Sequence, residues 1–142
     1  MKILLAVDGS AFALKAVDWV IAQLPLLREP PQIELVTVYT PLPEPPILRM
    51  VVAPVLRDEL YREEGEISLA PAQHRLAAAG VEYRAEVLIG AVAASLNLHA
   101  EKTGCCMIVV GTHGRGSAAQ VLLGSVATAV THLSKVPVLL VR

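Results

Sequence analysis

A chain of 142 residues, 54% of them hydrophobic, suits one domain with one core and excludes wholesale disorder. Its net charge of −1 gives no global electrostatic basis for binding DNA, RNA or an anionic membrane, so we expect neither nucleic acid nor membrane as a partner. No apolar run is long enough to span a membrane and the N-terminus carries no signal-peptide pattern, so we expect a cytoplasmic protein.

The first part of the chain predicts a strand, a helix and a second strand. The apolar run Lys2–Val7 is typical of a buried strand. Ala11–Leu27 has helical periodicity, and Ser10 before it is a suitable N-cap. Gln32–Tyr39 predicts the second strand. The prolines that follow exclude regular structure and predict a long surface loop over Thr40–Pro54.

The middle of the chain predicts a long helix and a strand with one wet face. The helix is expected over Val55–Ala79, kinked or broken by Gly65 and Pro71, and ended by Gly80. In Val81–Val87, apolar residues alternate with charged ones, which indicates a strand that is solvated on one face.

The last part predicts a helix over Ala91–Thr103, a strand over Met107–Val110, a helix over Ser125–Ser134 and a strand over Val138–Val141. Alternating strands and helices indicate an α/β fold with a parallel sheet and right-handed crossovers. Because the wholly apolar strands should be central and the alternating strand should lie at an edge, we expect the order 3-2-1-4-5. Residues 1–142 are then a single doubly wound, Rossmann-like domain of five parallel strands, with helices on both faces.

Polar and glycine-rich segments follow the first and fourth strands, whose loops diverge in this order at the usual place for a ligand. Asp8, Gly9 and Ser10 follow the first strand, Gly111–Ser117 follows the fourth, and Gly124 with Ser125 opens the last helix. Glycines let backbone amides approach a phosphate, a helix N-terminus adds free N–H groups, and Arg115 is a charged donor. We therefore expect a phosphate site here; the alternative is a tight glycine-rich connection without a ligand.

Two other nucleotide motifs do not fit this loop. A P-loop needs a lysine followed by serine or threonine after its second glycine, and no such lysine is present. Residues 114–119 match Gly-x-Gly-x-x-Ala, but a dinucleotide site needs an acidic residue about 20 positions later, and the chain has none beyond Glu101.

The spacing of Gly111, Gly114, Gly124 and Ser125 resembles the Gly-x2-Gly-x9-Gly-Ser/Thr motif of the ATP-binding type of universal stress protein. The first strand ending in Val7-Asp8-Gly9-Ser10 and the last strand, Val136–Val141, are also similar to that family, and the resemblance covers the whole chain. The chain departs from the family at Cys105-Cys106, often Ala-Asp, and at Val92, often proline.

The resemblance implies a ligand and a set of contacts. The ligand would be ATP, with ADP, AMP or another adenine-containing ligand as alternatives, and Mg or Mn would accompany the phosphates. The backbone of Gly111 and Gly114 would line ribose and phosphates, and Asp8 would contact the adenosine side or cap the turn beside Ser10. The other residues implied at the site are Ala6, Val38, Val110, His113, Arg115, Gly124, Ser125 and Val126.

Enzymatic chemistry is not expected beyond slow ATP hydrolysis. Asp8, Ser10, His113 and Ser125 would meet in one crevice, but no nucleophile-elbow pattern and no carboxylate pair accompanies them. We therefore expect a stress-response sensor or regulator that acts through its bound nucleotide and a protein partner of unknown identity. A slow ATP hydrolase and an interaction module without a nucleotide role are the alternatives.

The remaining histidines and cysteines lack zinc spacing. We interpret the lone helical histidines, His74, His99 and His132, as surface or packing residues. Cys105 and Cys106 are adjacent, so they are either a vicinal thiol site or two small buried residues at the start of a strand.

The last strand also predicts an assembly. Val138–Val141 is apolar on both faces, yet it lies at the sheet edge in the order 3-2-1-4-5, where unpaired backbone groups invite association. Antiparallel pairing with a second copy would cover that edge. The resemblance implies the same, so we expect a homodimer through Val136–Val141.

Overall fold

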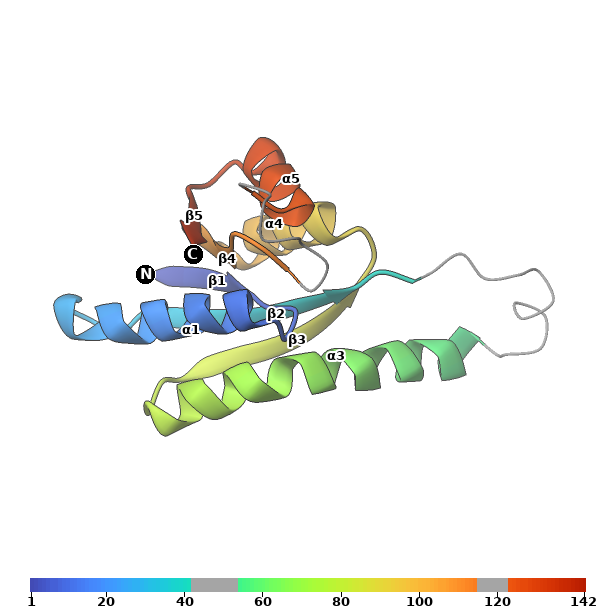
Figure 1. Ribbon diagram of the computed structural model, residues 1–142, viewed down its shortest axis with the longest axis horizontal. Helices are drawn as coiled ribbons and strands as arrows, with labels where there is room; N and C mark the ends of the chain where they lie inside the picture. Colours follow the sequence, from blue (N-terminus) through green and yellow to red (C-terminus); the bar gives the residue numbers. More distant parts are fainter. Residues whose placement is uncertain (42–53, 115–122) are drawn as a thin grey trace.

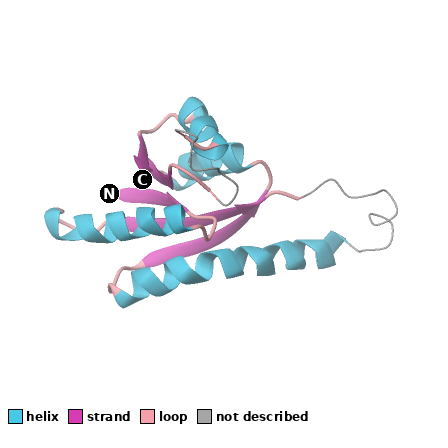
Figure 2. Ribbon diagram, viewed as in Figure 1, coloured by secondary structure: helices cyan, strands magenta, loops and turns pink. Residues whose placement is uncertain are grey.

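The computed structural model describes residues 1–41, 54–114 and 123–142. Most of the expected loop Thr40–Pro54 and the site residue Arg115 lie outside the described residues. The sheet has five strands in the order β3-β2-β1-β4-β5, and every pairing is parallel, which confirms the predicted α/β fold (Figure 1; Figure 2). The elements are β1 (Lys2–Ala6), α1 (Ala11–Gln23), a 3-10 turn (Leu24–Leu26), β2 (Gln32–Tyr39), α3 (Pro54–Ala78), β3 (Tyr83–Ile89), α4 (Val92–Thr103), β4 (Met107–Gly111), α5 (Ser125–Leu133) and β5 (Val138–Val141).

The helices cover both faces of the sheet, with α1 and α3 on one face and α4 and α5 on the other (Figure 1). Each face has its own apolar core, since successive residues of a strand point to opposite sides. In β1, for example, Leu5 is buried under α1 and α3, whereas Leu4 is buried under α4 and α5. No helix among the described residues is long and apolar enough to cross a membrane.

Helix α1 begins as predicted and ends earlier than predicted. The Oγ of Ser10 accepts the N–H of Ala13 at 3.2 Å, as expected of an N-cap. The predicted helix Ala11–Leu27 is α-helical only to Gln23, because Pro25 has no N–H to continue the ladder and starts a 3-10 turn instead.

Helix α3 is continuous from Pro54 to Ala78, so the expectation of a break was wrong, while a kink stays a prediction. At Gly65, an added Cβ would lie 2.3 Å from Cγ1 of Val87, so the glycine serves to let α3 approach β3 closely. Pro71 lies on the exposed side of the helix, where water can bond the carbonyl group that the proline leaves without a donor. The helix ends as predicted, with Gly80 at a φ of +67°.

A buried polar cluster lies under α4. Glu34 of β2 is 4% exposed and His99 of α4 is 8% exposed, and Oε2 of Glu34 lies 3.3 Å from Nε2 of His99. Nζ of Lys2 lies 3.6 Å from the other oxygen of Glu34. His99 is therefore a packing residue, as interpreted, but one with a buried carboxylate as its partner.

The two cysteines differ in environment. Cys105 is buried, and burial raises the pKa of its thiol, an effect that the hydrogen bond with Thr103 only partly offsets. Cys106 is exposed, and its thiol donates to the carbonyl group of Lys2 at 3.2 Å. The interpretation of two buried residues thus holds for Cys105 and is wrong for Cys106, and the raised pKa of Cys105 makes it a poor nucleophile.

Candidate functional site

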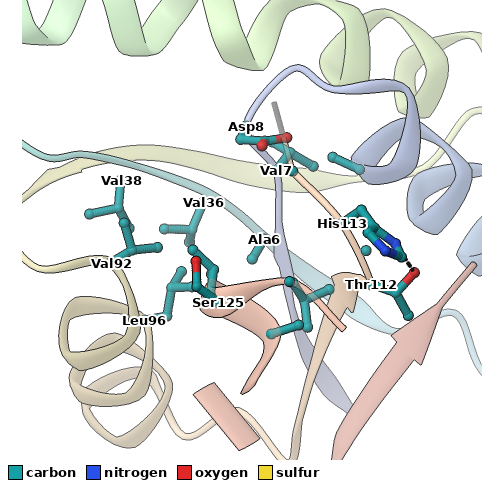
Figure 3. A pocket seen from close by; sticks show the side chains of 17 residues that line it. Ala6, Val7, Asp8, Val36, Val38, Val92, Leu96, Thr112, His113 and Ser125 are labelled. Carbon is teal, nitrogen blue, oxygen red and sulfur yellow. Dashed lines mark hydrogen bonds between the residues drawn. The ribbon is translucent and has the colours of Figure 1, made fainter. Parts of the chain in front are cut away.

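A cavity of about 670 Å³ lies at the carboxyl ends of β1, β2 and β4, where the first halves of α4 and α5 also converge (Figure 3). This is the point at which the loops leaving β1 and β4 diverge, as the strand order predicts. Its described lining consists of Ala6, Val7, Asp8, Ala13, Val36, Val38, Val92, Leu96, Val110, Gly111, Thr112, His113, Gly114, Gly124, Ser125, Val126 and Ala127.

One side of the cavity is apolar. Figure 3 shows Val38 of β2 close to Val92 of α4, with Val36 and Leu96 beside them. Val36 and Val38 lie on the same face of β2, two residues apart, and Val92 and Leu96 lie one helical turn apart on α4. This side offers a slot for a flat apolar group such as a nucleobase.

The opposite side carries the polar groups. His113 and Thr112 lie across the cavity from Val38 in Figure 3, and Nδ1 of His113 lies 3.0 Å from Oγ1 of Thr112. The ring of Phe12 packs against the ring of His113 at a centroid distance of 4.9 Å, which fixes the plane of the imidazole. Thr112 itself is buried.

Asp8 lies between these sides and belongs to the loop after β1. Its Oδ1 accepts the N–H of Ser10 at 2.9 Å, an Asx-type turn that leads the chain into α1. A Cβ on Gly114 would lie 2.8 Å from Oδ2 of the same carboxylate, so the glycine brings the loop after β4 close to Asp8. The turn and a place in the cavity lining therefore coexist at this residue.

The N-terminus of α5 forms the third side. Gly124 is the N-cap and provides no side-chain cap, and its N–H donates to the carbonyl group of Thr112 at 2.7 Å. The first turn of α5 contains no acidic residue, and Ser125, Val126 and Ala127 all line the cavity. The N–H groups of this first turn, which receive no side-chain cap from Gly124, and the positive end of the helix dipole favour an anion at this position.

Of the predicted site residues within the described part of the chain, all but Ser10 line the cavity. Ser10 is not part of the described lining. Its side chain caps α1, and its N–H donates to the carboxylate of Asp8, which does line the cavity. Sequence reasoning missed Val7, Ala13, Val36, Val92, Leu96, Thr112 and Ala127. The period of two along β2 could have found Val36 from Val38, whereas the contribution of α4 had no local signal.

The described lining of the cavity contains few ionisable groups. Among the described lining residues, only Asp8 and His113 carry an ionisable side chain. The described residues hold no group of three or more His, Cys, Asp or Glu suited to a metal ion. The cavity thus has two parts. An apolar slot can take a flat ring, and the adjoining N-terminus of α5 is suited to a phosphate group.

Comparisons with known proteins agree with this geometry. The model of the universal stress protein family matches residues 1–142. Universal stress protein YxiE of Bacillus subtilis is 32% identical over 150 residues, covering 99% of this chain and 98% of that protein. The solved structure of the hypothetical protein MJ0577 superposes with a TM-score of 0.77 at 26% identity, covering 99% of this chain and 94% of its own. A universal stress protein solved in complex with cAMP superposes with a TM-score of 0.66 at 26% identity, covering 100% of this chain and 96% of its own.

Proposed function

This chain belongs to the universal stress protein family, and from that premise we propose that its cavity binds an adenine nucleotide, ATP first, and that the bound state regulates a stress response. The observation that carries the proposal is that one cavity joins the apolar slot at Val38 and Val92 to the N-terminus of α5, whose N-cap Gly124 has no side chain. These two features match the two ends of a nucleotide. The complex of a related protein with cAMP supports the choice of adenine.

The positions that we propose for the base, ribose and phosphates follow from placing the base in the apolar slot and the phosphates at the N-terminus of α5. Adenine lies between β2 and α4, the ribose near Asp8, and the phosphates at Gly124, Ser125 and the loop that begins at Gly111. Magnesium or manganese would arrive with the phosphates and remain coordinated mainly by them. The nucleotide acts as a signal through a partner protein, and turnover is not required.

Thermal unfolding tests the binding. We expect micromolar affinity, about −8 kcal/mol, for ATP. At a hundredfold excess over the dissociation constant, binding stabilises the fold by about 2.7 kcal/mol. In a domain of this size, the melting temperature should rise by several degrees. Melting curves with ATP, ADP and AMP, with and without magnesium, check this. Unchanged melting temperatures under all of these conditions would refute the proposal.

We also propose that the chain forms a homodimer through β5, the edge strand next to β4. The carbonyl group of Pro137 accepts the N–H of Ile108 in β4 at 3.0 Å, and that of Val141 accepts the N–H of Thr112, the residue after β4, at 2.8 Å. Because backbone direction alternates along a strand, Leu139 also faces β4, and the N–H groups of Val138 and Leu140 face outward. An antiparallel copy of β5 would bond these outward groups.

Leu140→Pro should therefore split the dimer, because proline removes an outward donor at the pairing edge. Leu139→Pro is the matched control: it removes a donor that faces β4, so we expect it mainly to lower the free energy of unfolding. Sedimentation velocity at micromolar concentration distinguishes the species. A wild-type protein that sediments as a monomer contradicts the pairing and leaves the nucleotide site untouched.

A further inference from the structure

The outward face of α3 carries large apolar side chains that no described element covers. Leu56 is 52% exposed, Leu60 is 50% exposed and Ile67 is 66% exposed. The buried residues of α3, such as Leu69 and Leu76, face the sheet on the opposite side of the helix. In Figure 1, α3 forms the lower border of the molecule, and none of the labelled helices or strands lies against its outward face.

These residues belong to a regular row, which we name the α3 seam. Steps along the row alternate between four and three residues, the a and d spacing of a coiled-coil heptad, and every member is exposed. The row places three large apolar residues, Leu56, Leu60 and Ile67, on the side of the helix that faces away from the sheet, whereas the apolar stripe of a helix that only covers a sheet faces inward. The seam consists of Leu56, Leu60, Glu63, Ile67, Ala70, His74 and Ala77.

We propose that the α3 seam binds the α3 seam of a second copy of this chain, in antiparallel orientation about a two-fold axis. The a positions of an antiparallel pair face the d positions of the partner. With the axis midway between Ile67 and Ala70, Ile67 faces the partner's Ala70 and Leu60 faces the partner's Ala77, so two of the large residues each meet a small one. Leu56 has no counterpart in this register, because the axis sets it opposite a position beyond the end of α3. In the remaining layer, Glu63 faces the partner's His74, a carboxylate against an imidazole.

The reverse orientation is disfavoured by the same residues. In a parallel pair, each position faces its own copy, so Glu63 would meet the partner's Glu63 and His74 would meet the partner's His74. A parallel pair would thus place like side chains, two of them carboxylates, directly opposite each other. The match of large to small residues, and the separation of the two Glu63 carboxylates, therefore favour a second copy as the partner and the antiparallel register.

This contact is distinct from the edge of β5, because α3 lies beside β3 at the other end of the sheet. A single pair of helices of this length buries less than a standard interface of about 1,600 Å², so we expect weak association. Its role is then a concentration-dependent step that adds to any pairing through β5.

Sedimentation equilibrium of the full chain tests the seam, over subunit concentrations up to about 100 micromolar. At the upper end of this range the wild type should have a higher weight-average mass than the Leu60→Glu/Ile67→Glu variant, whether or not β5 pairs. Leu98→Glu is the matched control, since Leu98 is also 52% exposed but lies on α4. It should behave as the wild type. Far-UV circular dichroism checks that each variant is folded. Equal masses for wild type and seam variant across this range would overturn the proposal.

A charge exchange tests the register. In the His74→Glu variant, the new carboxylate at position 74 faces Glu63 of the other copy, and the two-fold axis repeats this contact. Association should therefore weaken about fivefold or more. Adding Glu63→Lys to this variant restores opposite charges in an antiparallel pair, so association should return to within about twofold of wild type. In a parallel pair the double variant would create two like-charged layers. Failure of the double variant to recover overturns the antiparallel proposal.

Discussion

The Gly124→Asp variant is expected to lose all nucleotide stabilisation while remaining folded. Gly124 is the N-cap of α5 and lines the cavity, so an aspartate there places a carboxylate where the phosphates are proposed to lie. Aspartate is itself a good N-cap and favours the positive end of the helix dipole, so the ligand-free protein should not be destabilised by charge. The rise in melting temperature with ATP should disappear.

The control for this variant is Gly124→Asn, which has the same size and cap chemistry without the charge. A Cβ at position 124 would lie 3.1 Å from the carbonyl oxygen of Thr112, so both variants share the same steric adjustment. If charge at the phosphate position is what matters, the asparagine variant should keep much of the ATP response that the aspartate variant loses. An aspartate variant that melts with the full wild-type shift would show that the phosphates do not lie at α5.

Replacing His99 by leucine is expected to reduce the free energy of unfolding by about 3 kcal/mol, because it leaves the buried carboxylate of Glu34 without its nearest partner. Lys2 is more distant from that carboxylate, at 3.6 Å, and is itself partly exposed. Glu86, near the other ring nitrogen of His99 at 3.8 Å, is 47% exposed and can be solvated. The cost therefore arises mainly at Glu34.

A double variant separates this cause from loss of packing. Glu34→Leu/His99→Leu removes both polar partners and should be more stable than His99→Leu alone, since no buried charge remains unpaired. Urea unfolding of the wild type, both single variants and the double variant at one pH measures the coupling. A double variant whose loss equals the sum of the single losses would mean that the two side chains do not stabilise each other.

The order of the strands could be predicted because the composition of a strand indicates its position in the sheet: wholly apolar strands are buried on both faces, and a strand that alternates apolar and charged residues is solvated on one face. Gln32–Tyr39 and Val138–Val141 have the predicted limits, and the alternating strand β3 lies at the edge as predicted. Interactions between distant residues could not be predicted. Gly65 reads locally as a helix breaker, and only its contact with Val87 shows why the helix continues. The pairing of Glu34 with His99 likewise joins residues that are 65 positions apart.

One side of the candidate site could likewise be predicted from the sequence, and the other could not. Its polar side could be located from the loops and glycines that follow the strands, and Asp8, Gly111, Gly114 and Gly124 line the cavity. Its apolar side depends on how α4 lies against β2, which no local pattern specifies. Val92 and Leu96 read as ordinary core positions of an amphipathic helix until the fold places them at the cavity.

Equilibrium dialysis of the wild-type protein against labelled ATP tests the central claim most directly, because it measures binding without relying on stability. We expect one nucleotide per chain, with a dissociation constant in the micromolar range, about −8 kcal/mol, and competition by unlabelled AMP or ADP. Absence of bound ATP at free concentrations up to about 1 mM would contradict the account.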